Sequence, residues 1–329
     1  MFEVFKKRPK ILAEAQNAKF KPGLVVQIFI FLAIFIVSNI LQAIPLTIYA
    51  IFWSVFKVIG SDGHFGDGIE FTVVYDELMS NLMLPSLFAF GIITIVVIIY
   101  CRYIEKRSLY SMGFVRKNAF TDYLKGLLIG FVMFASAVLL AFISGTVKYN
   151  GFVLGNGLGF LIAFFIGFII QGMAEEVLTK GYFMVSVANR HSVLLAVISN
   201  SIIFSILHIF NFGISPLAVL NLFLFGFFTS VYMLKMNSIW GICAIHSMWN
   251  FAQGNIFGIS VSGAKSQVSL FSFKLNSGAE LINGGSFGLE GGLAVTVVLI
   301  ISIILIMNIK GKNIAEASEI YSYQEEKSV

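Results

Sequence analysis

Charged residues are scarce in this sequence. They make up only 12% of the 329 residues, whereas 58% are hydrophobic and 15% are aromatic. A soluble domain usually carries about a quarter charged residues, so this chain lacks the polar surface that a globule needs in water. The composition therefore excludes an ordinary soluble protein and predicts an integral protein of a lipid bilayer.

Cysteine is also scarce, because only Cys101 and Cys243 occur. Two cysteines, each in or beside an apolar segment, exclude a disulfide framework and a CxxC metal site. The 22 Lys and Arg residues contribute to a net charge of +5, but they are scattered over short connections between apolar segments. A nucleic-acid-binding protein gathers such residues on one face, so nucleic acid is excluded as a partner.

Long apolar runs fill most of the remaining sequence. A helix rises about 1.5 Å per residue, so about 20 apolar residues cross a hydrocarbon core about 30 Å thick. These runs predict an all-α, polytopic membrane bundle of about eight transmembrane helices, at residues 24–56, 81–101, 124–146, 158–179, 192–210, 216–236, 239–258 and 288–308. The first run is too long for one upright span, and Pro45 within it leaves open whether it forms one span or two.

Basic residues alternate along the connections. Residues 1–23 hold six basic side chains and two acidic ones, residues 57–80 hold one and five, and residues 101–125 hold six and two. Cytoplasmic connections carry the excess of Lys and Arg, so the first and third of these segments are predicted to be cytoplasmic. Eight spans then place both termini in the cytoplasm, and the absence of organelle signals favours a bacterial plasma membrane.

The apolar runs and the polar connections divide the chain into six segments. We expect a basic cytoplasmic segment at 1–23, N-terminal transmembrane helices at 24–157, a core of four spans at 158–258, an extracytoplasmic loop at 259–287, a last transmembrane helix at 288–308 and a solvated cytoplasmic tail at 309–329. In the loop, QVSLFSFKL at 267–275 alternates roughly between polar and apolar residues. This alternation predicts a short hairpin or a lid on the outer face.

A few strongly polar side chains lie within predicted spans. Such groups usually line a bundle interior or a cavity, because leaving a charge in hydrocarbon costs a few kcal/mol or more. The clearest cases are Glu175 and Glu176 in GMAEEVLTKGYF, His208 in FSILHIF, and His246 and Asn250 in AIHSMWNF. These five residues are the candidate functional site.

The spacing of these residues brings two of the helices together. The fourth and fifth spans form a hairpin that turns near 189–191, and Glu175 and His208 lie about 22 and 26 Å from that turn, so they share a level. Glu175 and Glu176 are about 100° apart around a helix, so only one can face His208 and the other can pair with Lys180. His246 is expected at a shallower depth, which leaves its contact with the pair open.

The residue types suit hydrolysis. A buried carboxylate beside an imidazole can act as a general base on a water molecule that attacks a carbonyl. A second histidine with an asparagine can donate hydrogen bonds to the resulting oxyanion. Glu175, His208 and His246 could instead bind Zn²⁺, as in a metalloprotease, although such a site normally has three ligands with the base as an additional group.

At these residues the sequence resembles the CPBP family of intramembrane proteases, also called the CAAX protease and bacteriocin-processing or Abi family. Its motifs EExxxR, FxxxH and HxxxN match EEVLTK at 175–180, FSILH at 204–208 and HSMWN at 246–250. The resemblance covers roughly 158–255 and implies the family's helical core. It further implies that Glu175 acts as the base with His208, that His246 and Asn250 stabilise the oxyanion, and that Glu176 is a second acid paired with the basic residue of its motif.

One position departs from the family pattern. Lys180 stands where the motif has arginine, which keeps the charge but loses the planar group that grips a carboxylate with two hydrogen bonds. The family includes members described as metal-dependent and members described as glutamate-dependent, and the sequence does not choose between them.

The resulting prediction is an intramembrane endopeptidase that cleaves a membrane protein or a hydrophobic peptide. The alternatives are a noncatalytic scaffold or bacteriocin-immunity protein that binds a partner membrane protein, which the lysine at position 180 favours, and a transporter with a proton relay. The transporter is disfavoured because no inverted repeats occur.

Overall fold

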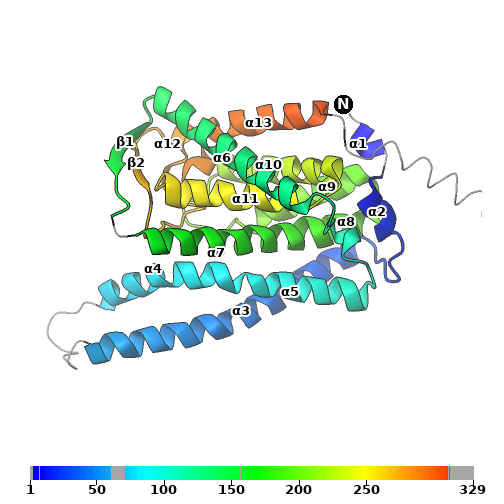
Figure 1. The fold of residues 1–329 in the computed structure, drawn as a ribbon, viewed down its shortest axis with the longest axis horizontal. Coiled ribbons are helices and arrows are strands. Elements are labelled where there is room, and N and C mark those ends of the chain that lie inside the picture. Colours follow the sequence, from blue (N-terminus) through cyan, green and yellow to red (C-terminus); the bar gives the residue numbers. More distant parts are fainter. Residues whose placement is uncertain (1–2, 7, 61–70, 156, 310, 312–329) are drawn as a thin grey trace, which may run out of the picture.

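The computed structural model describes residues 3–6, 8–60, 71–155, 157–309 and 311, and it is a bundle of long helices. Most of the helices run roughly along one common direction, with α3, α4 and α5 forming one side of the bundle and α13 the other (Figure 1). The solvated tail predicted at 309–329, apart from residues 309 and 311, and residues 61–70 of the acidic connection at 57–80 lie outside the described residues.

The helices follow the predicted apolar runs closely. The membrane-length elements are α3 (Leu24–Gly60), α4 (Phe71–Ala89) continued by α5 (Gly91–Ile99) and the π-helix η1 (Tyr100–Ile104), α6 (Ala119–Ile143), α7 (Leu158–Glu176) continued by the π-helix η3 (Val177–Met184) and α8 (Val185–Ala188), and α10 (Pro216–Met236). The shorter ones are α1 (Glu3–Lys6), α2 (Lys10–Ala15), α9 (Val193–Ile206), α11 (Trp240–Phe251) with the π-helix η4 (Ala252–Ile256), α12 (Glu280–Asn283) and α13 (Leu293–Asn308). Single 3₁₀ turns are η2 (Tyr110–Met112), η5 (Gly285–Phe287) and η6 (Leu289–Gly291).

Five helical stretches in the described residues are long and apolar enough to cross a membrane. They are Leu24–Lys57, Glu77–Ile104, Ala119–Ile143, Leu158–Ala188 and Pro216–Met236. The first contains Pro45 without interruption, so residues 24–56 form one helix rather than two. Its 37 residues span about 55 Å, which exceeds the hydrocarbon thickness and requires tilt or protrusion.

Two predicted spans are shorter than the sequence suggested. The span expected at 192–210 ends as a helix at Ile206 and continues as turns, and the span expected at 288–308 begins only at Leu293. Gly288 explains the second difference, because its positive φ of 102° lies outside the helical region. The 3₁₀ turn η6 therefore precedes α13.

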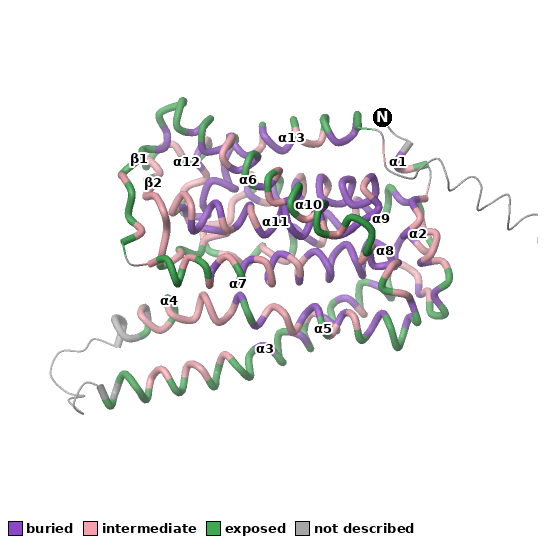
Figure 2. The backbone as a smooth tube through the Cα atoms, viewed as in Figure 1, coloured by how far each residue is buried: buried purple, intermediate pink, exposed green. Residues whose placement is uncertain are grey.

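Helix α11 lies at the centre of the bundle, packed against α6, α7 and α10. Glycines allow the closest approaches: a Cβ atom at Gly130 of α6 would lie 3.0 Å from the Cα of Ile245, and one at Gly172 of α7 would lie 2.8 Å from the backbone nitrogen of Ser247. Small residues at such crossings let helix backbones approach closely in membranes. Buried residues gather on these central helices, whereas α3 is largely exposed (Figure 2).

The exposed residues of α3 are mostly large and apolar, including Phe29, Ile40 and Phe52. In water such a surface would be an aggregation hazard, but hydrocarbon accepts it without cost. The burial pattern thus agrees with a helix that faces lipid.

Residues 271–275 of the predicted segment 267–275 do form a strand, but the prediction of a hairpin is wrong, because this strand pairs with a segment far away in the sequence. β2 (Phe271–Leu275) pairs antiparallel with β1 (Val147–Phe152), and Val147 lies opposite Leu275. The alternation of QVSLFSFKL did indicate a strand, but the second strand comes from the connection between α6 and α7, which sequence periodicity alone does not pair. This small sheet covers one end of the bundle (Figure 1).

The basic connections meet at the other end. Hydrogen bonds join the N-terminal segment to the connection after α5 and to the turn after α8: Lys19 N–H donates to the carbonyl of Glu105, Arg8 Nη1 donates to the carbonyl of Ala188, and Arg190 Nη1 donates to the carbonyl of Lys21. The two basic segments predicted to be cytoplasmic, 1–23 and 101–125, therefore share one end of the molecule with the turn after α8. Their assignment to the cytoplasmic side stays a prediction from charge.

Candidate active site

The two acidic side chains lie where α7 passes into the π-helix η3. π-Helical turns are rare and are often found at functional sites. Neighbouring residues on a helix point about 100° apart, so Glu175 and Glu176 reach different surroundings. Glu175 reaches a cavity, whereas Glu176 is fully buried in the protein interior.

Glu175 faces both histidines. Its Oε2 atom lies 3.7 Å from Nε2 of His208 and 3.8 Å from Nε2 of His246. The contact with His208 agrees with the equal depths estimated along the helix pair. The contact with His246, which the depth estimate left open, is also present because α11 crosses α7 closely at Gly172.

Glu176 forms a second set of contacts behind the first. Its Oε1 accepts hydrogen bonds from Nζ of Lys180 and from Nδ1 of His246, each at 3.0 Å. The pairing with Lys180 was expected from the i,i+4 spacing, whereas the bond to His246 was not. Glu176 thereby holds the His246 ring so that Nε2 points toward Glu175.

Phe204 sits between the charged groups of the site. The Nζ atom of Lys180 lies 4.1 Å from the centre of its ring, a cation–π contact. The same ring lies 5.0 Å from the His208 ring and 5.9 Å from the His246 ring, measured between centroids. The phenylalanine of the FxxxH pattern therefore contacts Lys180 and both imidazoles.

The His208 ring is fixed from the other side. The backbone carbonyl of Phe204 accepts a hydrogen bond of 2.8 Å from Nδ1. Because Nδ1 is engaged by the backbone, Nε2 is the nitrogen that faces Glu175.

Gln171 completes the site, and the sequence analysis missed it. Its amide Nε2 donates to Oε1 of Glu175, and its carbonyl oxygen accepts a hydrogen bond of 3.0 Å from Nδ2 of Asn250. Gln171 thus links the carboxylate on α7 to the asparagine on α11. Its position one helical turn before Glu175 was the signal that could have identified it.

These groups open into a cavity of about 360 Å³. Glu175, His208, His246, Asn250 and Gln171 line one part of it. The rest of the wall is mainly apolar and comes from α4, α10 and α13 and from the loop at 261–264, with Met83, Leu87, Phe90, Leu222, Phe225, Val261, Val295 and Leu299 among its members. A cavity of this size and composition suits a hydrophobic segment with a few fixed polar contacts.

Glu290 also lines the cavity and was missed. It lies within the predicted span 288–308, so the test for charged residues inside spans could have found it. Trp249 Nε1 donates to one of its oxygens, at 3.2 Å, and the backbone and hydroxyl of Ser262 donate to the other, each at 2.9 Å.

Zinc binding was the alternative for the same side chains, with Glu175, His208 and His246 as the ligands. Among the residues that the structure describes, no group of three or more His, Cys, Asp or Glu side chains is arranged to hold a metal ion. Binding of Zn²⁺ by these three residues stays a prediction from the sequence.

The arrangement can bind and activate a water molecule. Glu175 Oε2 has no hydrogen-bond partner among the described residues and faces two imidazole nitrogens at the cavity wall. A carboxylate so placed can take a proton from water. Asn250 has a second amide N–H beyond the one given to Gln171, which is available to a developing negative charge.

One known protein family matches part of the chain. Residues 157–252 match the family model described as type II CAAX prenyl endopeptidase Rce1-like. No curated protein and no solved structure gives a significant match. The matched residues run from the start of α7 to the start of η4 and include all five residues predicted from the sequence. Residues 157–252 are therefore similar to the Rce1-like endopeptidase family, and they lie within a multi-pass helical membrane protein.

Proposed function

We propose that this protein is an intramembrane endopeptidase that hydrolyses a peptide bond in a membrane protein or hydrophobic peptide. The observation that carries the proposal is the approach of Glu175 Oε2 to the Nε2 atoms of His208 and His246, at 3.7 and 3.8 Å, in a largely apolar cavity. We place the protein in a plasma membrane with both termini in the cytoplasm, from the distribution of basic residues.

In the proposed reaction, Glu175 takes a proton from water while the oxygen of that water attacks the carbonyl carbon of the substrate. His208 lies beside Glu175 and orients the water together with it. The tetrahedral intermediate carries its negative charge on the former carbonyl oxygen. Protonated Glu175 then gives its proton to the leaving nitrogen, and the C–N bond breaks.

His246 and Asn250 stabilise the oxyanion. Protonated on both nitrogens, His246 donates Nδ1–H to Glu176 and Nε2–H to the oxyanion, while Asn250 donates its free amide N–H. Donors of this kind, fixed in a site that excludes bulk water, contribute about 10²–10³ in rate each. Glu176 and Lys180 act behind His246, where they hold its ring and balance its charge.

The central test replaces Glu175 by glutamine and compares the membrane proteomes of cells with the wild-type and variant proteins. We expect substrates to accumulate uncleaved in Glu175→Gln cells, although the amount of protease in the membrane is unchanged. Glu77→Gln, at a partly exposed α4 residue that pairs with Lys57 outside the cavity, is the matched control and should leave processing as in wild type. Intact processing in Glu175→Gln cells would remove the catalytic assignment and leave a noncatalytic scaffold.

A further inference from the structure

Glu290 gives the cavity a second carboxylate, away from the proposed catalytic pair. It lies in the turn η6 before α13 and is 8% exposed. Its three hydrogen-bond donors, from Trp249 and Ser262, leave the carboxylate with acceptor capacity, since two oxygens offer about four lone-pair sites. Because all these contacts are donated to it, the group is bound as an acceptor, which is the behaviour of an ionised carboxylate.

No ion pair neutralises the Glu290 carboxylate among the described residues. The donors from Trp249 and Ser262 are neutral. None of the described residues that line the cavity is a lysine or an arginine. Lys180, a buried cation outside the cavity lining, is paired with Glu176. The wall therefore carries negative charge that a bound ligand can neutralise.

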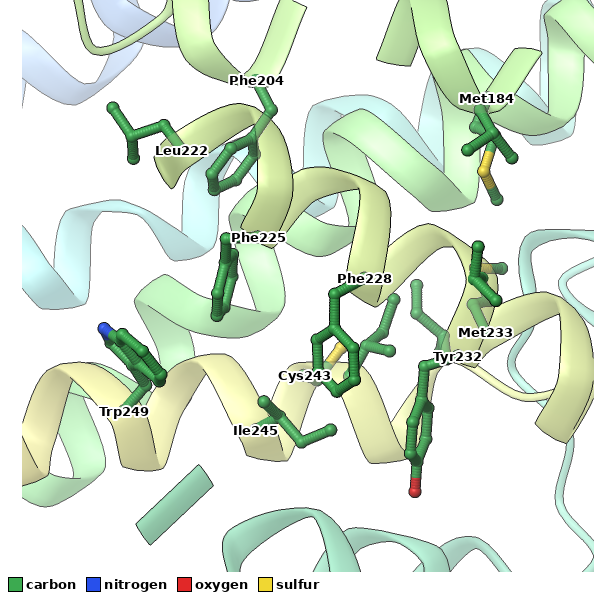
Figure 3. Close-up of a cluster of buried hydrophobic side chains, with 14 of the residues drawn as sticks. Met184, Phe204, Leu222, Phe225, Phe228, Tyr232, Met233, Cys243, Ile245 and Trp249 are labelled. Atoms are coloured by element: carbon green, nitrogen blue, oxygen red, sulfur yellow. The ribbon is translucent and has the colours of Figure 1, made fainter. Parts of the chain in front are cut away.

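Glu290 is connected to the proposed catalytic residues through Trp249. Trp249, which donates to Glu290, follows His246 by three residues on α11, a rise of about 4.5 Å. Phe225 lies between Phe204 and Trp249 (Figure 3), with its ring 5.3 Å from that of His246 and 5.5 Å from that of Trp249. Glu290 and His246 line the same cavity, and an extended peptide, which advances about 3.3–3.6 Å per residue, can pass both groups.

We propose that Glu290 recognises a cationic side chain of the substrate, so that the preferred substrate is a hydrophobic peptide segment with Lys or Arg one or two residues from the cleaved bond. A fixed acidic group in a partly buried wall attracts a cation and repels an anion. A segment that ends in a free carboxylate near the cleaved bond is disfavoured by the same charge. This specificity rests on the proposed endopeptidase function.

The other role open to Glu290 is purely structural. Its bonds to Ser262 and Trp249 join the loop at 261–264 to α11, and losing them loosens the cavity wall. A structural role acts on every substrate alike, whereas charge recognition changes the ratio between a cationic substrate and its neutral match. The ratio is therefore the quantity to measure.

The experiment uses the full-length protein in detergent and hydrophobic decapeptides blocked at both ends. One position at a time carries lysine, norleucine, glutamine or glutamate. For the wild-type protein we expect kcat/KM to be about tenfold higher for lysine than for norleucine at one or two positions beside the cleaved bond, and lowest for glutamate. The Glu290→Gln protein should lose this ratio.

Ser262→Ala is the matched control, because it removes one bond to Glu290 but keeps the charge. It should retain the lysine preference, even if total activity falls. Equal kcat/KM for lysine and norleucine in the wild-type protein, or the same lysine preference in Glu290→Gln and wild type, overturns the proposal.

Binding separates this inference from the proposed function. The peptides are labelled with a fluorophore, and their affinities for the Glu175→Gln protein are measured, so that no cleavage is needed. Tighter binding of the lysine peptide than of the norleucine peptide, lost in the double variant Glu175→Gln/Glu290→Gln, supports the cation site. If the wild-type protein cleaves none of the peptides but binds them with this preference, the endopeptidase function fails while the cation site stands. Equal affinities for the lysine and norleucine peptides overturn the cation site, whether or not cleavage occurs.

Discussion

Replacing Lys180 by methionine tests the charge balance behind the active site. Lys180 and Glu176 are both fully buried and pair at 3.0 Å, and Glu176 also holds His246. Methionine keeps an unbranched side chain of similar length but removes the charge. The variant leaves Glu176 as an uncompensated buried carboxylate, which typically costs about 3–5 kcal/mol when one partner of a buried pair is removed.

The expected loss is large enough to measure in detergent. At about 2 °C per kcal/mol for a large domain, the midpoint of thermal unfolding should fall by roughly 6–10 °C. Cys101 and Cys243 are both buried free thiols, so a dye that reacts with exposed thiols reports unfolding without any added label. Processing of the substrate identified with Glu175→Gln should fall as well, because Glu176 no longer holds His246 in a fixed orientation.

Two further variants define what is lost. Lys180→Met/Glu176→Gln removes both charges and should recover part of the stability but none of the processing, since a neutral amide does not stabilise a charged His246. Lys180→Arg keeps the charge and should retain processing, with at most the cost of overpacking, about 1–3 kcal/mol. A Lys180→Met protein that unfolds at the wild-type temperature would refute the reasoning, because the pair would then carry no buried charge.

Two other predictions concern residues around the site. Gly172→Ala should separate α7 from α11 and reduce both processing and the unfolding temperature, because its Cβ would lie 2.8 Å from the backbone nitrogen of Ser247. The control is Gly159→Ala on the same helix, which has open space around it and should change neither quantity. Gln171→Ala should lower processing by up to about 100-fold by freeing the two side chains it holds, since small misplacements of reacting groups have effects of this size. Asn200→Ala, which removes a buried hydrogen bond outside the cavity, should lower stability but keep the specific activity of the folded protein. An inactive Gly159→Ala or Asn200→Ala protein, or a fully active Gln171→Ala protein, would contradict these assignments.

The membrane fold was predictable because it depends on features that are local in sequence. Apolar runs of about 20 residues identify helices, since backbone groups in hydrocarbon must be satisfied within the helix itself. The departures occur where nonlocal contacts decide. β2 pairs with β1 across more than 100 residues, and α13 begins late because Gly288 has a positive φ.

The candidate site was predictable only in part. Equal distances from a hairpin turn placed Glu175 beside His208, but the approach of His246 depends on how α11 crosses α7, which rests on Gly172 and cannot be read from depth along one helix. The role of Gln171 was not predicted, because a single glutamine in an apolar run usually forms a hydrogen bond that packs two helices together. Its role is visible only once Asn250 is known to lie within hydrogen-bond distance.

The contacts of Lys180 explain how the site keeps its geometry without the arginine of the family motif. Arginine would grip Glu176 with two parallel hydrogen bonds, whereas lysine supplies a compact charge with one direct bond. Here the ammonium group also lies 4.1 Å from the ring centre of Phe204, which stabilises a desolvated cation by about 2 kcal/mol and limits where it can move. Glu176 is thereby held between Lys180 and His246. Lys180 therefore supplies the charge beside Glu176 that the motif assigns to arginine, and the comparison of Lys180→Arg with the wild-type protein tests the noncatalytic alternative.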